Sequence, residues 1–393
     1  MTYQEDFTLP ADLLKEISEQ GLDFIPELIR ILVNAAMKAE RQNHLRAAPY
    51  QHSSERNGHA NGYKPKTLTT RLGEITFDIP QVREGGFYPS ALEKGLRSER
   101  ALHLALAEMY VQGVSTRKVA AIVEQLCGTS VSSTLVSQAA SKLDESLEAW
   151  RNAPLGEIVY LYLDARYEKV RQDGQIRDAA VLLAVGVDLE GHRRILGISI
   201  SLSEAEIHWR TFLQSLVSRG LMGVRLITSD DHPGLKAARR MVFSGIPWQR
   251  CQFHLQQNAS AYVPRQSMKT EVAADIRKIF NAPDRATADI YLAQTVQKYA
   301  KTAFRLSEWL EKNIPEGLTV FAFPVAHQRK LRTTNMVERL NREIHRRTAV
   351  ASIFPSESSC LRLISAFLIE CDEEWQVSGR VYLTFPEEGQ PSQ

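Results

Sequence analysis

The chain has 393 residues, of which 44% are hydrophobic and 24% are charged, and its formal net charge is +2. These values are ordinary for a soluble globular protein, and the length allows two or three domains with proper cores. A net charge so close to zero excludes a uniformly basic protein, so any attraction to nucleic acid must come from local clusters. Basic residues do gather between Arg41 and Arg71 and between Arg329 and Arg347.

The cysteines do not indicate a disulfide framework. Cys127, Cys251, Cys360 and Cys371 are scattered, which favours reduced thiols in a cytosol. The first residues lack the basic start and apolar core of a signal peptide. No apolar stretch approaches the roughly 18 residues that a membrane span requires. We therefore expect a cytoplasmic protein without membrane contacts.

Helices and a hairpin are expected in the first part of the chain. Apolar residues recur every three or four positions over residues 10–46, which predicts helices that form a small packing or dimerisation element. Residues 50–66 are polar and rich in turn-forming residues, as is typical of an extended arm. Strand-like runs at residues 66–71 and 74–80 flank Leu72-Gly73, which predicts a hairpin.

Residues 98–148 return to a helical pattern with two short capped helices. A turn at Gly128 separates these helices, and the second begins near Ser132. The arrangement is typical of a helix-turn-helix, whose second helix enters the major groove of DNA. Plain helical bundles contain similar pairs, so both interpretations stay open.

Strand patterns begin near residue 155, and the expected strands are 157–163, 166–172, 179–187, 193–201, 224–229 and 246–250. A capped helix at 203–219 and a helix at 232–243 alternate with the later strands. Antiparallel strands followed by alternating strands and helices predict a ribonuclease-H-like α/β domain. The segment after the last strand is expected to be a helical insertion, followed by a basic helix at 335–347.

A mostly helical DNA-binding region, with the hairpin and the helix-turn-helix, is expected to precede this catalytic domain. The expected boundaries are 1–48 for the N-terminal helices, 49–95 for the arm and hairpin, 96–152 for the helix-turn-helix, 153–253 for the first part of the catalytic core, 254–326 for the insertion, 327–376 for the second part of the core and 377–393 for the tail.

Three acidic residues stand where a divalent-metal phosphoryl-transfer site needs them. Asp164 and Asp230 each end an apolar run, and Glu338 lies in the basic helix. The backbone of a strand end is fixed by its hydrogen bonds, and side chains on neighbouring strands converge. Carboxylate oxygens suit Mg²⁺, and two such ions about 3.5–4 Å apart stabilise the entering and leaving oxygens of a displacement at phosphorus. The sequence therefore predicts a two-metal site at these three carboxylates.

Each acid also has a simpler interpretation, as an exposed side chain or a helix cap. Asp231 and Glu343 compete with Asp230 and Glu338 for the same roles. We expect Asp231 to cap the helix that begins near Pro233, where an acid complements the helix dipole.

Side chains near these acids leave further alternatives open. Tyr167, Lys169 and Arg171 alternate along a strand, so they share a face that either contacts the DNA backbone or is solvated. Cys251 and His254 have half the spacing of a zinc site. We expect His254 near the acids, with Cys251 packed under it.

DNA contacts are expected from basic and polar side chains in several parts of the chain, and those of Arg346 and Arg347 are expected to give salt-dependent affinity without sequence choice. Trp248 either stacks on a splayed base or packs in the core. Asn341, which follows Glu338 in the basic helix, is expected to line the same cleft. The candidate DNA-binding residues are Lys64, Arg71, Arg117, Lys118, Ser132, Ser133, Thr134, Lys169, Arg171, His254, Arg332, Asn335, Arg342, Arg346 and Arg347.

Motifs in order along the chain resemble those of Mutator-type bacterial insertion-sequence transposases. Leu163–Arg171 is similar to their first-aspartate motif, Ser229–Leu235 to the second, and Thr333–Asn341 to the motif that bears the glutamate. Trp248–His254 resembles their Cys-x-x-His signature, and Arg56–Pro80 also fits. The resemblance spans nearly the whole chain.

This resemblance implies a ribonuclease-H-like domain whose Asp–Asp–Glu triad is Asp164, Asp230 and Glu338. It implies Mg²⁺ or Mn²⁺ as cofactor, and a homodimer that acts on terminal inverted repeats. The protein would be bacterial, and associated with the nucleoid when bound to DNA. Asp231 is a departure, because many relatives have glycine there, and it adds negative charge beside the metal site.

Residues and resemblance together predict a metal-dependent DNA transposase. It would bind the ends of an insertion sequence, cleave a strand and transfer the freed 3′-hydroxyl to target DNA. A structure-specific nuclease of the same fold and a non-catalytic DNA-binding regulator are the alternatives. Preferential binding of repeat ends over scrambled duplex would exclude the nuclease without repeat recognition. Metal-dependent nicking of an element end would exclude the non-catalytic regulator.

Overall fold

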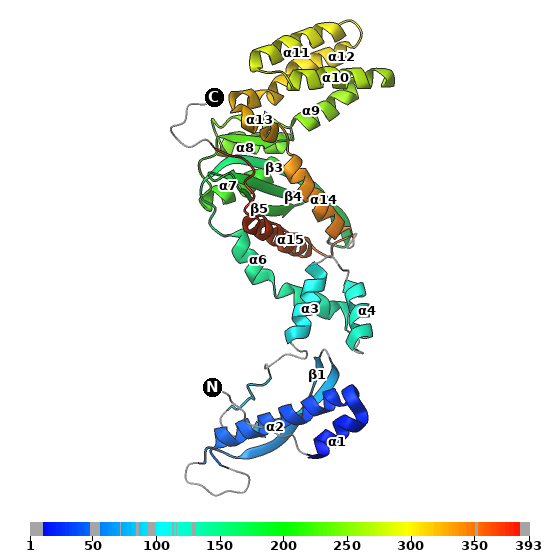
Figure 1. Ribbon diagram of the computed structural model, residues 1–393, viewed down its shortest axis with the longest axis vertical. Helices are drawn as coiled ribbons and strands as arrows, with labels where there is room; N and C mark the ends of the chain where they lie inside the picture. Colours follow the sequence, from blue (N-terminus) through cyan, green and yellow to red (C-terminus); the bar gives the residue numbers. More distant parts are fainter. Residues whose placement is uncertain are drawn as a thin grey trace. The chain divides into compact units, whose positions relative to one another are not determined.

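The computed structural model describes residues 11–47, 56–70, 72–83, 86–92, 100–111, 114, 116–127, 131–349 and 353–385 (Figure 1). The chain divides into two compact units, Met1–Lys142 and Leu143–Gln393. Several expectations lie outside the described residues: Arg71 as a DNA contact, the start of a helix at residue 98, the turn at Gly128, and the tail from Pro386.

The first unit begins with helices and a hairpin, as predicted. These elements are α1 (Ala11–Gln20), the 3₁₀ helix η1 (Gly21–Phe24), α2 (Ile25–Leu45), β1 (Ala60–Thr70) and β2 (Gly73–Val82). Met37 of α2 packs against Leu68 of β1 and Phe77 of β2. The expectation that residues 60–65 belong to an extended arm is wrong. They pair with β2 as far back as the pair of Ala60 with Val82. Backbone hydrogen bonds therefore extend β1 through these residues, although most of their side chains are exposed.

Three further helices of this unit share a separate core. They are α3 (Arg100–Val111), α4 (Thr116–Cys127) and α5 (Ser133–Ser141). Leu106, Val119 and Val136 are buried together in that core. The predicted cap of the last helix is confirmed, because Ser132 precedes α5 and its Oγ accepts a hydrogen bond from the backbone N of Leu135 at 3.1 Å.

The second unit contains a five-stranded mixed sheet in the order β5-β4-β3-β6-β7. Its strands are β3 (Ile158–Gln172), β4 (Gln175–Asp188), β5 (Arg193–Ser201), β6 (Leu226–Ser229) and β7 (Trp248–Arg250). The first three strands pair antiparallel, whereas β6 pairs parallel with both β3 and β7. The unit is therefore an α/β fold, as predicted.

The predicted strand break at Asp164 is wrong. β3 is one strand of 15 residues, and Asp164 pairs with Leu183 of β4 in its middle. The apolar run ends at Leu163 for a different reason. There β6 stops pairing with β3, the last pair being Leu163 with Ser229. The rest of β3 continues beside β4, and on its other side it has a short bridge between Val170 and Phe354.

Helices cover both faces of the sheet (Figure 1). They are α6 (Asp144–Arg151), α7 (Glu206–Ser218), α8 (Pro233–Val242), α13 (Val325–Leu331), α14 (Asn335–Thr348) and α15 (Glu357–Val377). Leu161 and Leu163 of β3 pack with Trp209 of α7, in a core that also includes α8. Alternate residues point the other way, since the Tyr160 hydroxyl lies 2.9 Å from Nδ1 of His327 in α13. Asp164 shares that second face.

The helix predicted at 203–219 begins later than expected. Its N-cap is Ala205, which has no side-chain capping bond, so the predicted cap is wrong. The residues between β7 and α13 are helical, as predicted, with a core of their own. The elements are α9 (Gln252–Ala259), η2 (Ser260–Tyr262), η3 (Gln266–Met268), α10 (Lys269–Phe280), α11 (Arg285–Tyr299), α12 (Phe304–Asn313), η4 (Ile314–Gly317) and η5 (Thr319–Ala322). Among the described residues, no helix combines the length and apolar character needed to cross a membrane.

Candidate active site

Two of the predicted acids lie side by side at the end of the parallel strands. The last residue pair between β3 and β6 is Leu163 with Ser229. Asp164 and Asp230 each follow that pair directly, so they occupy matching positions on the two neighbouring segments. Cys251 follows β7 in the same way, and its backbone N donates to the Ser229 carbonyl at 2.8 Å. This edge of the sheet therefore gathers side chains from β3, β6 and β7.

The segment that leads into α14 is anchored to the same edge. The Thr228 hydroxyl of β6 donates to the Leu331 carbonyl at 3.0 Å, and the Gln252 backbone N donates to the Arg332 carbonyl at 2.9 Å. The two donor residues have backbones that are fixed in β6 and α9. The first turn of α14, which carries the third acid, is therefore held at the ends of β6 and β7.

Thr334 orients Glu338 within that first turn. Its hydroxyl donates to Oε1 of Glu338 at 3.3 Å, and its carbonyl accepts the Glu338 backbone N–H at 2.9 Å. Thr334 is fully buried, and its backbone N and its hydroxyl both lie within 3.5 Å of the Cys251 sulfur. The sequence prediction missed this residue. Thr334 is the N-cap of α14 but makes no side-chain capping bond, and its spacing to Glu338 is not that of a capping box, so no local sequence rule indicated it.

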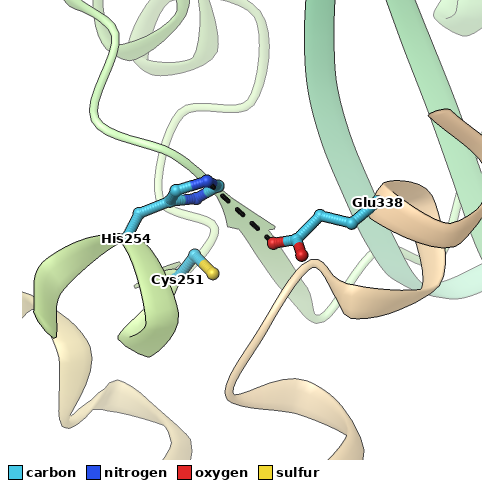
Figure 2. A group of neighbouring side chains, drawn as sticks. All are labelled: Cys251, His254 and Glu338. Atoms are coloured by element: carbon cyan, nitrogen blue, oxygen red, sulfur yellow. Dashed lines mark ion pairs between the residues drawn. The ribbon is translucent and has the colours of Figure 1, made fainter. Parts of the chain in front are cut away.

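His254 lies near the acids, as predicted, and Figure 2 shows its ring beside Glu338. Its Nδ1 is 3.9 Å from Oδ1 of Asp230, and its Nε2 is 4.0 Å from Oε1 of Glu338. Cys251 is fully buried beside it. The neighbouring thiol, together with the negative charges of Asp230 and Asp164, raises the pKa of His254 to about 9, although burial opposes the shift. At neutral pH the imidazole is therefore a cation among carboxylates.

Asp164 has the most perturbed carboxylate of the site. Burial is the main cause that raises its pKa to about 7, and the negative charges of Glu338 and Asp230 raise it further, while His254 lowers it. The Asn341 side chain donates from Nδ2 to Oδ2 of Asp164 at 2.8 Å, so the prediction that Asn341 lines this cleft is confirmed. A buried carboxyl group whose pKa is raised, with other acids beside it, is typical of functional sites.

The donor set of this edge suits a hard divalent cation, because carboxylate oxygens are its preferred ligands and a positive charge would offset their repulsion. The described residues also contain a closer group, Cys251, His254 and Glu338, whose ligand atoms all lie within 4.8 Å of one another. Asp164, Asp230 and Glu338 are spaced more widely than that. A structural zinc site takes four ligands, so the cysteine–histidine–glutamate group has one too few.

The predicted capping role of Asp231 is wrong. The N-cap of α8 is His232, without a side-chain capping bond. Asp231 instead forms ion pairs with Lys236 at 3.0 Å and with the buried Arg250 at 2.9 Å. Both cations offset its negative charge, so it does not simply add charge beside the acids. The pairing depends on a residue almost twenty positions away, which local capping rules do not consider.

Trp248 and Glu343 have partners elsewhere. The Trp248 Nε1 donates to Oγ of Ser229 at 2.9 Å, and its ring packs against Lys236 and Arg239, with 4.8 and 5.0 Å from cation to centroid. The packing interpretation of this tryptophan therefore holds. Glu343 pairs with Arg346 at 3.0 Å, and both side chains are exposed.

The predicted DNA contacts of the second unit differ in availability. Lys169 and Arg171 are exposed at alternate positions of β3, and Asn335, Arg342 and Arg346 are exposed on α14. Arg332 donates to Oδ1 of Asn281 at 2.9 Å. Arg347 is mostly buried, pairs with Glu370 at 3.1 Å and lies over the Phe367 ring.

The predicted contacts of the first unit lie on its hairpin and helices. Lys64 of β1 is exposed, as are Arg117 and Lys118 of α4. In the first turn of α5, Ser133 and Thr134 are exposed, while the Ser132 hydroxyl is engaged as the N-cap. A DNA-binding role for each of these residues stays a prediction.

Comparison with known proteins places the chain in a family. Residues 2–378 match the family described as "Transposase, Mutator family". The chain belongs to this family. Over 369 residues it is 59% identical to the transposase for insertion sequence element IS406 of Burkholderia multivorans. That alignment covers 93% of this chain and 95% of that protein. Further family relatives are the transposases for insertion sequence elements ISRM5 of Rhizobium meliloti (42% identity, 97% of this chain, 95% of that protein) and IS256 of Staphylococcus aureus (36%, 97% and 99%).

Proposed function

We propose that the chain is a metal-dependent DNA transposase that binds the terminal inverted repeats of an insertion sequence, cleaves a strand and transfers it to target DNA. Membership of the Mutator family supports DNA transposition, because the relatives are named as transposases of insertion sequence elements. One observation supports the chemistry. Asp164, Asp230 and Glu338 come from separate elements, and His254 bridges the latter two at one edge of the sheet.

The fold proposed for the catalytic unit is ribonuclease-H-like. Its support is the sheet order β5-β4-β3-β6-β7, with an antiparallel meander followed by parallel strands, and a later helix that brings the third acid to the strand ends. For α4 and α5 we propose a helix-turn-helix that reads the repeats, with Ser133 and Thr134 facing DNA. Action as a homodimer on paired repeat ends is part of the same proposal.

Asp164, Asp230 and Glu338 would hold Mg²⁺ or Mn²⁺, and their hard oxygen donors fit such ions. When bound, the ions supply Lewis-acid stabilisation of the charge that develops around phosphorus. The protein's own contribution is orientation. Asn341 fixes one carboxylate oxygen of Asp164, and Thr334 fixes one of Glu338.

The proposed reaction consists of two displacements at phosphorus. In cleavage, a water oxygen bonds to phosphorus and the bond from phosphorus to the 3′ oxygen breaks. The attacking water releases a proton to solvent, and the leaving 3′ oxygen takes up a proton from solvent to become a 3′-hydroxyl. In transfer, the oxygen of that hydroxyl bonds to a phosphorus of the target and displaces the 3′ oxygen there. No covalent bond between protein and DNA forms. Exposed Lys169, Arg171 and Arg342 are available to neutralise the phosphates that flank the reacting one.

Conservative substitution of each acid tests the proposal. Asp164→Asn, Asp230→Asn and Glu338→Gln should each abolish cleavage of a labelled repeat end in Mn²⁺ or Mg²⁺, with binding of that end retained. Glu343→Gln, an exposed acid on the same helix, should cleave normally and is the matched control. Near-normal cleavage by one of the three variants would remove that acid from the site.

The same assay separates the alternatives. Equal binding and cleavage of scrambled duplex at matched salt would indicate a nuclease without repeat recognition. Binding of repeat ends without nicking in any divalent metal would indicate a DNA-binding regulator.

A further inference from the structure

An aromatic side chain lies exposed beside the candidate catalytic acids. Phe253 of α9 is 53% exposed. Its ring meets the His254 ring edge-on, with 5.5 Å between centroids. Since the His254 ring contacts Asp230 and Glu338 with its nitrogens, Phe253 is one side chain away from the carboxylates.

Phe253 also lines a cavity of about 330 Å³ between α9 and α10. Residues 253, 256, 257 and 260 follow helical spacing and share this face. At these positions a helix that packs into a core normally carries apolar residues, but here the phenylalanine is followed by Gln256, Gln257 and Ser260. The opposite wall is apolar, with Ile276 among its residues, and Lys269 also lines the cavity.

Three polar side chains of this cavity are free to receive a ligand, whereas the Ser260 hydroxyl donates to the Gln257 carbonyl. In the described part of the chain, neither the Gln256 nor the Gln257 side-chain amide is hydrogen-bonded to another residue, and Lys269 has no ion-pair partner. An aromatic face, apolar walls and amides that both donate and accept are the chemistry that recognises a nucleobase. The volume lies at the lower end of the range for small-molecule sites. A cation without an ion-pair partner in the lining suits the phosphate attached to such a base.

We propose that this cavity receives one unpaired base of the DNA strand whose phosphate lies at the three carboxylates. The ring of Phe253 stacks on the base, and the amides of Gln256 and Gln257 hydrogen-bond to its edge. The inference rests on the proposed function, and adds how the strand end is held. It also gives the stacking role considered for Trp248 to a different residue, because the Trp248 ring already packs against Lys236 and Arg239.

A cycle between protein and DNA variants tests the stacking. Phe253→Ala should lower cleavage of the intact repeat end on the order of tenfold, from the stacking energy of one base. An abasic site is then placed in turn at each nucleotide that flanks the cleavage position. At one of these positions the wild type should lose a similar factor, and Phe253→Ala should lose nothing further.

The controls separate stacking from folding. Phe253→Trp keeps an aromatic face and should restore cleavage, while Phe304→Ala removes another exposed phenylalanine of the insertion and should cleave normally. A Phe253→Ala defect of equal size on intact and on all abasic DNAs, or no defect at all, would overturn the stacking proposal alone. Absence of cleavage by the wild type would overturn the proposed function and this inference with it.

Discussion

Asn341 donates a hydrogen bond from Nδ2 to Oδ2 of Asp164 across 2.8 Å, and this bond joins α14 to β3. Glu338 lies one turn earlier on the same helix. The bond therefore fixes the side chain of one acid and, through the helix, the distance to another. Acids that share a cation need this kind of support, because their mutual repulsion drives them apart when the cation is absent.

Removal of this bond should weaken the site without removing an acid. We expect Asn341→Ala to cleave about 10–100-fold more slowly, which is typical for the loss of a partner that orients a metal ligand. The check is the cleavage rate of a repeat end across a Mn²⁺ titration, where high metal should recover part of the loss. DNA binding should not change. Full activity at every metal concentration would show that the bond is dispensable.

Arg250 should be the most costly single cation to remove from the catalytic unit. It is 3% exposed and contacts Asp231 at 2.9 Å, Glu316 at 3.1 Å and Oδ1 of Asn313 at 2.9 Å, so it ties β7 to the insertion. Arg250→Ala leaves two acids with Lys236 as their cation, and we expect a loss of about 3–5 kcal/mol in the free energy of unfolding. Urea denaturation followed by circular dichroism measures this loss.

Two variants sharpen that measurement. Arg250→Lys should recover part of the loss, because the contacts with Asp231, Glu316 and Asn313 all come from one nitrogen, Nη1, and an ammonium group also carries several donors. Arg285→Ala breaks an exposed pair with Asp289 and should cost less than about 1 kcal/mol. Equal losses for the buried and the exposed arginine would contradict the structural argument.

The sequence predicted that these acids lie near one another more reliably than it predicted their contacts. Asp164 and Asp230 follow apolar runs, and such runs report burial in a sheet directly. The run before Asp164 did not end the strand, however, because its apolar character depends on the neighbour β6, which stops at Ser229. The pairing of Leu163 with Ser229, which are 66 positions apart, is not encoded in local periodicity.

Contacts between distant residues account for the other differences. Asp231 was predicted as a helix cap from its position before Pro233, but Arg250 is buried and requires a negative partner, and that requirement decides the contact. Thr334 is ordinary in the sequence. Its position against Cys251 and Glu338 follows only once β7 and α14 have met.

Asp372 should make stability depend on pH. This buried carboxylate of α15 accepts hydrogen bonds from the Ile195 backbone N at 2.7 Å and from Nε2 of Gln376 at 2.7 Å, yet burial dominates and raises its pKa. A carboxyl whose pKa is higher in the folded than in the unfolded state contributes stability that is full below the unfolded pKa. That contribution is lost as pH rises through the folded pKa.

The asparagine variant isolates this effect, because it cannot ionise and keeps an oxygen for Ile195. Relative to the wild type, Asp372→Asn should gain stability as the pH rises above the ordinary carboxyl pKa of about 4. Asp372→Ala should lose about 1–3 kcal/mol, since the buried Ile195 N–H is left without its acceptor. Urea midpoints at several pH values measure both differences. A wild-type-to-asparagine difference that does not change with pH would contradict the raised pKa.

Gly234 should tolerate no side chain, because the start of α8 packs directly on the backbone at the start of α7. A Cβ at this position would lie 2.1 Å from the Glu204 carbonyl oxygen and 2.9 Å from the Glu206 backbone N. Neither backbone atom can rotate away, so Gly234→Ala has to push α8 outward, at a cost of about 1–3 kcal/mol in the free energy of unfolding.

The thermal midpoint of Gly234→Ala should therefore fall. Arg240→Ala, an exposed change on the same helix, should leave the midpoint within experimental error. Because Asp230 lies in the connection between β6 and α8, the same shift should also lower cleavage more than DNA binding. An unchanged thermal midpoint for Gly234→Ala would mean that the two helices do not pack this closely.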